Sequence, residues 1–344
     1  QPALTIEQGV EIHRLPWPRN RLYRWTLLWP LAITRMIQLT RKSDVVHAHN
    51  YSGFGLLAII VAKLCQKPII VKLPSFGDAG LPGFVKSSFG QTKLQIFKRA
   101  TAIVAMSVES LIELAAIGYD SRRVLATPNG IHCVQLKNQP AYNPDNLCRI
   151  VFIGRLVSAK GLPILLDAVD ILLKQTPKLN FSLDIYGDGP EYSLLKESIH
   201  EKQLSKVVQL RGHHDQAAKV LVGYDVLVLP SYREGNSNVI LEAMAAGVPV
   251  VSTRVGGTPM LLGPEGGPWM HEPGDAQALS NLLEQLISDV QTREQLGALM
   301  RRRVEQKFDM RVVAGTYEAA YRKLAEGKEH EVADLSNPIV TMIQ

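Results

Sequence analysis

Short apolar runs rich in β-branched residues alternate with helical patterns from residue 44 onward. In the first half of the chain these runs predict buried strands at 44–49, 67–73, 100–107 and 123–130. The stretches between them predict helices at 55–64, 88–99 and 108–117. Strands that are apolar throughout and alternate with helices are typical of a parallel sheet covered on both faces.

A polar segment without periodicity interrupts this alternation. Residues 132–148 contain two prolines and predict a linker. Beyond the linker, apolar runs predict further strands at 149–156, 180–187, 207–212, 225–231 and 248–253. A helix is expected over 161–175, and the pattern is helical after residue 275. We therefore expect an α/β fold of two doubly wound parallel-sheet domains, with ligands at the carboxyl ends of the strands.

The composition fits such a fold. A length of 344 residues is typical of two domains, and a hydrophobic share of 46% with 20% charged residues is that of a globular protein. The three cysteines have no paired spacing, which favours a reducing compartment over a disulfide framework. Neither a signal-peptide pattern nor an apolar run near the roughly 20 residues of a membrane span is found, so we expect a cytoplasmic protein.

Positive charge is concentrated in the first part of the chain. Residues 1–131 hold 16 Lys and Arg against 7 Asp and Glu, although the whole chain carries only +6. This surplus suits an anionic partner: the inner face of a cell membrane, a phosphorylated substrate or, less well without a nucleic-acid motif, nucleic acid. A solvated basic face is the alternative. Residues 17–37, with three tryptophans among arginines, suit either a lipid–water interface or an ordinary packed helix.

Two glutamates follow the strand predicted at 225–231. Glu234 lies in the loop "YREGNSN", and Glu242 lies in the helix expected after it. Ser237 or Asn238 can cap this helix. Carboxylates accept hydrogen bonds from sugar and ribose hydroxyls, and the free N–H groups at a helix start attract an anion. Two ordinary acids on a surface helix are the alternative.

Two cations and a glycine-rich turn follow the first strands beyond the linker. Arg155 and Lys160 lie in "FIGRLVSAKG", between a strand end and a helix start. There an Arg can hold two phosphate oxygens and a Lys acts as a point charge. The turn "YGDGPE" at 186–191 allows close backbone approach, although no G-x-G-x-x-G is present. An ordinary solvated loop is the alternative for the two cations.

Histidines supply two further candidate positions. The stretch "DVVHAHNYSGFG" places His47 and His49 at a strand end, and we expect His49 in the loop and His47 packed in the strand. A purely structural histidine is the alternative. The adjacent His213 and His214 invite a metal interpretation, but neighbouring side chains on a short loop rarely converge on one ion. No metal site is predicted.

The order and spacing of Arg155, Lys160, Glu234 and Glu242 resemble the retaining family 4 glycosyltransferases of the GT-B fold. That family pairs an Arg and a Lys with a Glu-x7-Glu motif. The likeness covers residues 44–325, and it extends to "GVPVVSTRVGGTP" and "EPGDAQAL". It implies two Rossmann-like domains that face a cleft.

The resemblance implies a role for each matching position. Those with a catalytic role are His49, Arg155, Lys160 and Glu234. Those that contact the nucleotide-sugar are Arg155, Lys160, His213, Glu234, Gly235, Asn236, Ser237, Asn238, Val239 and Glu242. In this scheme the two cations stabilise the departing diphosphate, while Glu234 contacts the donor sugar and Glu242 the ribose.

The resemblance further implies transfer of a sugar from a UDP- or GDP-linked donor to a glycan or lipid-linked acceptor, with retention of configuration. No cofactor is expected, and the absence of a D-x-D motif argues against a metal-bridged donor. Bacterial surface polysaccharide or glycolipid assembly is the expected setting, with a peripheral position on the inner face of the membrane as an option. A GT-B-fold sugar-nucleotide epimerase and a non-catalytic sugar-nucleotide-binding remnant are the alternatives.

The resemblance also divides the chain into domains. We expect an acceptor-side domain over 1–131, a donor-binding domain over 149–310, and a C-terminal helix and tail over 311–344 that packs back toward the first domain. The strand and Gly-rich loop that usually open the family are not found, so the first domain is expected to lack one or two βα units. His132 after "PNGI" and Met260 after "GGTP" stand where acids are common.

Overall fold

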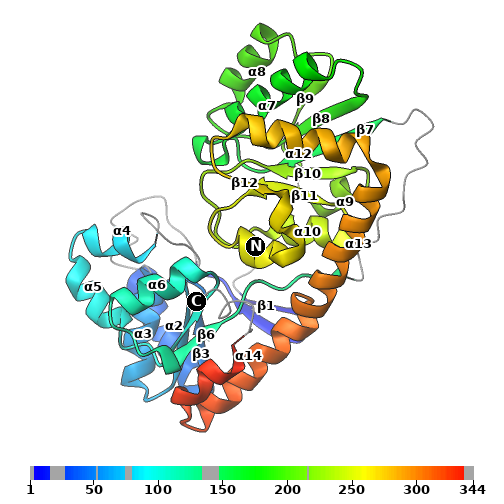
Figure 1. Cartoon of the computed structure of the whole chain (residues 1–344). Helices are drawn as coiled ribbons and strands as arrows, with labels where there is room; N and C mark the ends of the chain where they lie inside the picture. Colours follow the sequence, from blue (N-terminus) through cyan, green and yellow to red (C-terminus); the bar gives the residue numbers. More distant parts are fainter. Residues whose placement is uncertain are drawn as a thin grey trace. The chain divides into compact units, whose positions relative to one another are not determined.

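The structure is a computed structural model of the whole chain, and it describes residues 4–15, 28–51, 53–73, 80–133, 147–214 and 217–336. Most of the predicted linker and the first part of the 17–37 segment lie outside these residues. The chain forms two compact units (Figure 1). The first unit contains residues 1–104, 114–125 and 319–335, and the second contains 105–113, 126–318 and 336–344.

The first unit is built on a sheet with the strand order β3-β4-β5-β6. Its strands are β3 (Val46–Ala48), β4 (Ile69–Leu73), β5 (Ala102–Ala105) and β6 (Val124–Ala126). They confirm the four strands predicted in this half, and β3 pairs with β4 in parallel. The central strands are almost wholly buried. Burial on both faces explains why their sequences are apolar throughout rather than alternating.

Helices cover this sheet. Those of the first unit are α2 (Trp29–Lys42), α3 (Phe54–Leu64), α4 (Leu81–Lys86) and α5 (Gly90–Phe97), while α6 (Val108–Ala116) is divided between the two units. The end of α14 (Met310–Ala325) also belongs to the first unit. The apolar pattern does not predict α4, because Pro82 and Gly83 read as helix breakers. The proline lies in the first turn of α4, where its missing N–H costs no helical hydrogen bond.

A separate antiparallel hairpin precedes the first sheet. Its strands are β1 (Leu4–Glu7) and β2 (Val10–His13). Gln8 and Gly9 join them with φ angles of 50° and 83°, which matches the left-handed backbone of a two-residue hairpin turn. The apolar pattern does not predict this hairpin, because each strand has only four residues and several of its apolar side chains are exposed.

The second unit is built on a six-stranded sheet with the order β12-β11-β10-β7-β8-β9. The strands are β7 (Cys148–Ile153), β8 (Phe181–Tyr186), β9 (Val208–Gly212), β10 (Val226–Leu229), β11 (Val250–Thr253) and β12 (Met270–His271). Every neighbouring pair is parallel. The chain builds outward from β7 to β9 and then returns to place β10 on the other side of β7. The strand order therefore reverses between β7 and β10, the position where such sheets bind ligands.

The helices of the second unit are α7 (Leu162–Gln175), α8 (Tyr192–Glu201), α9 (Ala217–Leu221), α10 (Asn238–Ala246), α11 (Thr258–Gly266), α12 (Ala276–Ser288) and α13 (Val290–Lys307). The pattern misses β12, α9 and α11. The first two are too short to show a period, and α11 is kinked at Gly263 before Pro264. Among the helices that the structure describes, none combines the length and apolar character needed to cross a membrane.

The loops after β8, β7 and β10 pack backbone to backbone. A Cβ atom on Gly187 would lie 1.8 Å from the Gly154 carbonyl oxygen, so only glycine allows the β8 and β7 loops to meet. Between the β7 and β10 loops, the Tyr232 N–H donates to the Ala159 carbonyl oxygen at 2.9 Å. Gly161 has a φ of 65°, and a Cβ there would lie 2.1 Å from the Pro230 carbonyl oxygen. These contacts fix the rim of the sheet at its carboxyl edge.

Replacing Gly161 by Ala is expected to lower the free energy of unfolding by about 3–4 kcal/mol, because the added methyl group meets backbone and the left-handed φ is strained. Gly212→Ala is the matched control in the same unit, since Gly212 has a φ of 73° but no atom within 4 Å of an added Cβ. It should cost only about 1 kcal/mol. Urea unfolding followed by circular dichroism measures both, and equal losses would contradict the close-packing account.

Candidate functional site

The candidate site of the second unit lies where the strand order of its sheet reverses. Arg155 and Lys160 follow β7, and Glu234 follows β10. Because β7 and β10 are adjacent and parallel, their carboxyl ends lie at the same edge of the sheet. The short 3₁₀ helix Ser158–Lys160 then leads into α7. Sheet topology thus brings together side chains that are more than seventy residues apart in the sequence.

A buried ion pair joins the two loops. Lys160 Nζ donates to Glu234 Oε1 at 2.5 Å, and the Ser231 hydroxyl donates to the same oxygen at 2.8 Å. Only 6% of the Glu234 side chain and 20% of the Lys160 side chain are exposed. Two donors on one oxygen offset the desolvation cost of the carboxylate. Among the described residues, Glu234 Oε2 has no protein hydrogen bond, which leaves it for a ligand hydroxyl.

The sequence predicts separate ligands for these two side chains, the diphosphate for Lys160 and the sugar for Glu234. The structure places them against each other. An ammonium group has three donors, so Lys160 can hold Glu234 and still donate to a phosphate oxygen. Glu234 is buried, so it is not the ordinary surface acid of the alternative interpretation.

Arg155 differs from Lys160 in being exposed. Its guanidinium makes no hydrogen bond or ion pair with the part of the chain that the structure describes. The backbone beside it is fixed, because the Leu156 N–H donates to the Asp188 carbonyl oxygen at 2.9 Å and the Leu156 side chain is buried. Arg155 is therefore a free cation on a fixed loop.

The segment between the two glutamates is tied to a residue that the sequence analysis does not single out. The Asn129 N–H donates to Asn236 Oδ1 at 3.2 Å, and Asn129 Nδ2 donates to Asn238 Oδ1 at 2.8 Å. The Gly235 carbonyl oxygen accepts from the Gly257 N–H at 3.0 Å. The only sequence signal for Asn129 is the turn-like "PNG", which contains no information on its distant partners.

The start of α10 corrects the capping prediction. Ser237 occupies the N-cap position, but its side chain makes no capping hydrogen bond. Asn238 is already helical and uses its side-chain oxygen to bind Asn129 instead. The N–H groups of the first turn are therefore not consumed by either predicted cap, which suits an anion or a ligand oxygen at this end.

Glu242 lies about one turn inside α10, and Val239 beside it is half-buried. Partial burial raises the pKa of the Glu242 carboxyl above its usual value. Within the described residues its carboxylate has no hydrogen-bond partner. A hydroxyl that donates to this group would stabilise its ionised form and lower the pKa again.

His213 and His214 follow the end of β9 and are both exposed. The His214 ring meets the edge of the Tyr186 ring at a centroid distance of 6.0 Å. Residues 4–15, 28–51, 53–73, 80–133, 147–214 and 217–336 contain no group of three or more His, Cys, Asp or Glu side chains placed to hold a metal ion.

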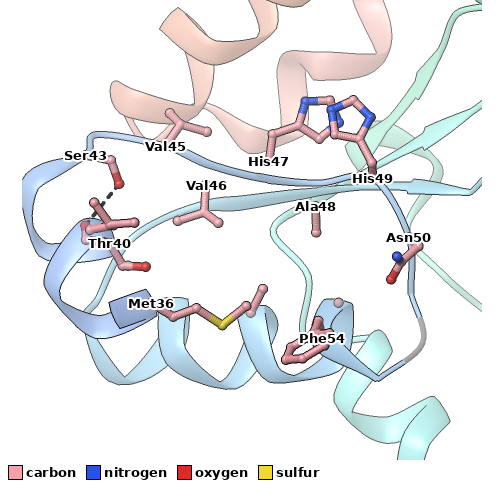
Figure 2. Close-up of a pocket in the computed structure, with 13 residues that line it drawn as sticks. Met36, Thr40, Ser43, Val45, Val46, His47, Ala48, His49, Asn50 and Phe54 are labelled. Carbon is pink, nitrogen blue, oxygen red and sulfur yellow. Dashed lines mark hydrogen bonds between the residues drawn. The ribbon is translucent and has the colours of Figure 1, made fainter. Parts of the chain in front are cut away.

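The predicted histidines of the first unit form a cluster on β3. The rings of His47 and His49 stack at a centroid distance of 4.3 Å, and His47 Nδ1 shares a 2.7 Å hydrogen bond with the Tyr321 hydroxyl. Figure 2 shows both rings on the side of β3 opposite Met36 and Phe54. His49 is exposed at the strand end and His47 is half-buried within β3.

Lys72 completes this cluster, although the sequence analysis does not name it. The register pairs Ala48 with Val71, so the next residues, His49 and Lys72, are neighbours at the ends of β3 and β4. Burial lowers the pKa of Lys72. The sequence signal that could have found it is a charged residue, Lys72, near the end of the apolar run "PIIVKL".

The environment keeps both imidazoles neutral. The pKa of His47 is lowered to about 4, mainly by burial and to a smaller extent by the charges of His49 and Lys72. Burial and Lys72 also lower the pKa of His49. Neutral imidazoles can accept as well as donate protons, which suits contact with hydroxyl groups.

Two cavities flank β3. One of about 530 Å³ lies among α2, β3 and α3, and its lining is mostly apolar, with Met36, Leu39 and Phe54 (Figure 2). The other, of about 570 Å³, is lined by the start of β3 together with Tyr321 and Arg322. His47 borders both cavities.

His47→Gln is expected to flatten the pH dependence of stability between about pH 6.5 and 4. The unfolded chain binds a proton at this position more readily than the folded one, so the free energy of unfolding of the wild type falls as the pH drops through this window, by roughly 2–3 kcal/mol. Urea unfolding at several pH values measures the slope. His200→Gln, at an exposed histidine of α8, should keep the wild-type slope. An unchanged slope in His47→Gln would refute the account.

Lys160→Ala is expected to lower the free energy of unfolding by about 3–5 kcal/mol, because it leaves a buried carboxylate without its cation. Adding Glu234→Gln should restore part of this loss, and a double-mutant cycle measures the coupling. Lys174→Ala is the control, since its ion pair with Asp170 is at the surface, with Lys174 72% exposed. That change should stay within about 0.5 kcal/mol. Additive losses at Lys160 and Glu234 would rule out the pair as a coupled unit.

Two family profiles match the chain. Residues 148–289 match the family described as "Glycosyl transferases group 1". Residues 1–130 match the family described as "Glycosyl transferase 4-like domain".

Several relatives align over most of the chain. WcaL of Escherichia coli (strain K12), named for colanic acid biosynthesis, is 30% identical over 296 residues, which cover 82% of this chain and 71% of WcaL. TuaC of Bacillus subtilis (strain 168), named for teichuronic acid biosynthesis, is 27% identical over 334 residues, 90% of this chain and 79% of TuaC. D-inositol 3-phosphate glycosyltransferase of Paenarthrobacter aurescens (strain TC1) is 28% identical over 318 residues, 85% of this chain and 76% of that enzyme.

Solved structures share the fold. Alr3699/HepE of Anabaena, in complex with UDP and glucose, has a TM-score of 0.73 at 20% identity and covers 89% of this chain and 84% of its own. Sucrose-phosphate synthase of Thermosynechococcus elongatus has a TM-score of 0.73 at 22% identity, with 95% of this chain and 86% of its own covered. The two sheet-containing units, the profiles and these relatives together show that the chain belongs to the family 4 glycosyltransferases with the GT-B fold.

Proposed function

We propose that this protein transfers a sugar from a UDP- or GDP-linked donor to a glycan or lipid-linked acceptor, with retention of configuration and without a metal ion. The observation that carries the proposal is the pairing of partly buried Lys160 with buried Glu234 at the reversal point of a parallel sheet, on the loop that also carries the exposed cation Arg155. Two neighbouring loops at the carboxyl edge of the sheet thus offer positive charge and a carboxylate oxygen to a ligand.

The two cations suit the leaving group. When the bond between the anomeric carbon and the diphosphate oxygen breaks, negative charge builds on the diphosphate and positive charge on the sugar ring. Arg155 can hold two phosphate oxygens, and Lys160 can add a third contact while it keeps Glu234. Preorganised charges of this kind stabilise a transition state without reorganisation. The UDP in the complex of Alr3699/HepE supports a nucleoside diphosphate as the ligand class.

The two glutamates suit the hydroxyl groups of the donor. Glu234 Oε2 would accept from the sugar, and Glu242 would accept from the ribose. Val239 and the backbone of Gly235 would line the pocket around them. A metal-free reaction agrees with the two cations and with the absence of a D-x-D motif in the sequence.

The proposed class of acceptor is supported by the names of two relatives and by the charge of the first part of the chain. TuaC and WcaL are named for teichuronic and colanic acid biosynthesis. A surface polysaccharide or a lipid-linked glycan is therefore the proposed acceptor class. The basic surplus of residues 1–131 suits an acceptor held at the anionic inner face of a membrane. In the first unit, His49 and Lys72 are proposed to contact hydroxyl or phosphate groups of the acceptor.

Calorimetric titration with UDP and GDP tests the donor site. Arg155→Ala is expected to weaken binding of the preferred nucleotide by roughly 10- to 100-fold, because a charge-assisted bidentate contact is lost, and to leave the urea midpoint unchanged because Arg155 is exposed. Arg302→Ala, at an exposed arginine of α13, is the control and should bind as the wild type does. Binding by neither nucleotide, or no effect of Arg155→Ala, would overturn the proposal.

Product analysis separates transfer from the other activities of such a site. UDP or GDP release that depends on an added glycan or glycolipid acceptor supports transfer. Conversion of the donor to its epimer would instead identify an epimerase. Tight donor binding without turnover across the acceptors tried would instead identify a non-catalytic binding protein.

A further inference from the structure

The turn between α4 and α5 exposes an aromatic side chain in a strained backbone conformation. Phe89 is 82% exposed, the highest value among the large apolar side chains of the described residues. Its φ and ψ are 59° and 28°, in the left-handed region. That conformation is unfavourable for a residue with a Cβ, and glycine or asparagine adopts it at lower cost. Packing does not explain the choice of phenylalanine, because the ring contacts little of the protein.

The turn itself is held rigidly. A Cβ on Gly90 would lie 1.8 Å from the Val85 carbonyl oxygen, so the backbones of α4 and α5 are in close contact here. Beneath the turn, Phe84 meets Tyr51 edge to face at 5.1 Å and lies 6.5 Å from Phe97. The turn that carries Phe89 is therefore firmly supported by the contact between α4 and α5, the two helices labelled in Figure 1.

Several cations lie on the two helices that this turn joins. Lys86 ends α4 and is exposed. Lys93 lies one turn into α5, where its Nζ donates to the Ser87 hydroxyl at 3.0 Å. Lys98 and Arg99 follow at the other end of α5. Between residues 80 and 108 the sequence contains no Asp or Glu. The turn thus combines one protruding aromatic ring with a stretch of sequence that has Lys and Arg but no acidic residue.

We infer that the α4–α5 turn docks on an anionic phospholipid bilayer, with Phe89 inserted at the level of the headgroups and Lys86 and Lys93 against lipid phosphates. An aromatic ring gains from burial at the lipid–water interface, and nearby cations are attracted to anionic lipid. This inference rests on the proposed function, because docking would serve the transfer reaction only if the acceptor is held in the membrane. Docking would bring the first unit to the surface that carries the acceptor.

Vesicle sedimentation tests the aromatic contact. Vesicles of phosphatidylcholine with phosphatidylglycerol, at about 30% anionic lipid, are expected to bind the wild-type chain, and vesicles of pure phosphatidylcholine to bind it far less. Phe89→Gly should weaken binding by roughly tenfold or more, because the buried ring is lost. The same variant should unfold at an equal or higher urea concentration, because glycine relieves the left-handed strain. A purely structural role for Phe89 would give the opposite shift in stability.

Matched control variants test whether any exposed apolar side chain or any exposed lysine would have the same effect on vesicle binding. Leu194→Ser removes another exposed apolar side chain, 65% exposed on α8, and should leave binding unchanged. Lys86→Glu should weaken binding roughly tenfold or more, whereas Lys196→Glu, which makes the same charge change on exposed α8, should weaken it by less than about threefold. Equal losses in Lys86→Glu and Lys196→Glu would show that net charge alone drives binding and would overturn the inference.

Two further results of the vesicle assay would contradict the docking proposal. Wild-type binding that does not depend on anionic lipid, or that persists fully in Phe89→Gly, would overturn the docking surface. Nucleotide titration of Phe89→Gly and Lys86→Glu is expected to match the wild type, because neither residue lies in the donor site. A wild type that binds UDP or GDP but no vesicle would therefore reject the membrane contact alone, while loss of nucleotide binding in Arg155→Ala supports the donor site independently.

Discussion

The buried ion pair between Lys160 and Glu234 is the interaction on which the candidate site depends. It joins two loops that follow adjacent parallel strands at the carboxyl edge of the sheet, where the strand order reverses and such sheets bind ligands. The Ser231 hydroxyl satisfies the same carboxylate oxygen, so the charge is both paired and hydrogen-bonded. Because the pair fixes Glu234 from one side, its second oxygen remains for a ligand, and so does the guanidinium of Arg155 on the loop after β7.

Close backbone contacts make this arrangement rigid before any ligand arrives. Gly161 and Gly187 allow neighbouring loops to touch where a side chain would collide with a carbonyl oxygen. The hydrogen bonds from Asn129 to Asn236 and Asn238 add a further constraint at the start of α10. A rim of this kind holds its charges in position, and such preorganisation is what stabilises a developing diphosphate charge efficiently. Substitution of these glycines or buried polar groups is therefore expected to lower the stability of the unbound fold.

The first unit contributes different chemistry. His47 and His49 are kept neutral by burial and by Lys72, and Tyr321 fixes the ring of His47 through its hydroxyl. Neutral imidazoles next to a partly buried lysine offer hydrogen-bond donors and acceptors to hydroxyl and phosphate groups. The α4–α5 turn adds a second kind of surface, with an exposed ring among cations. The proposed donor site and the proposed docking turn therefore belong to separate units of the chain.

The sequence by itself predicted the strands of both parallel sheets except β12, and it placed Arg155, Lys160 and Glu234 after strand ends, because burial on both faces of a parallel sheet leaves a local apolar signature. It missed the β1–β2 hairpin, the two-residue β12 and α4, whose residues do not show that signature. Only the tertiary structure decided that Lys160 pairs with Glu234, that Asn129 holds Asn236, and that Lys72 lies beside His49. These contacts join residues far apart in the chain, and strand order, not local pattern, determines which loops become neighbours.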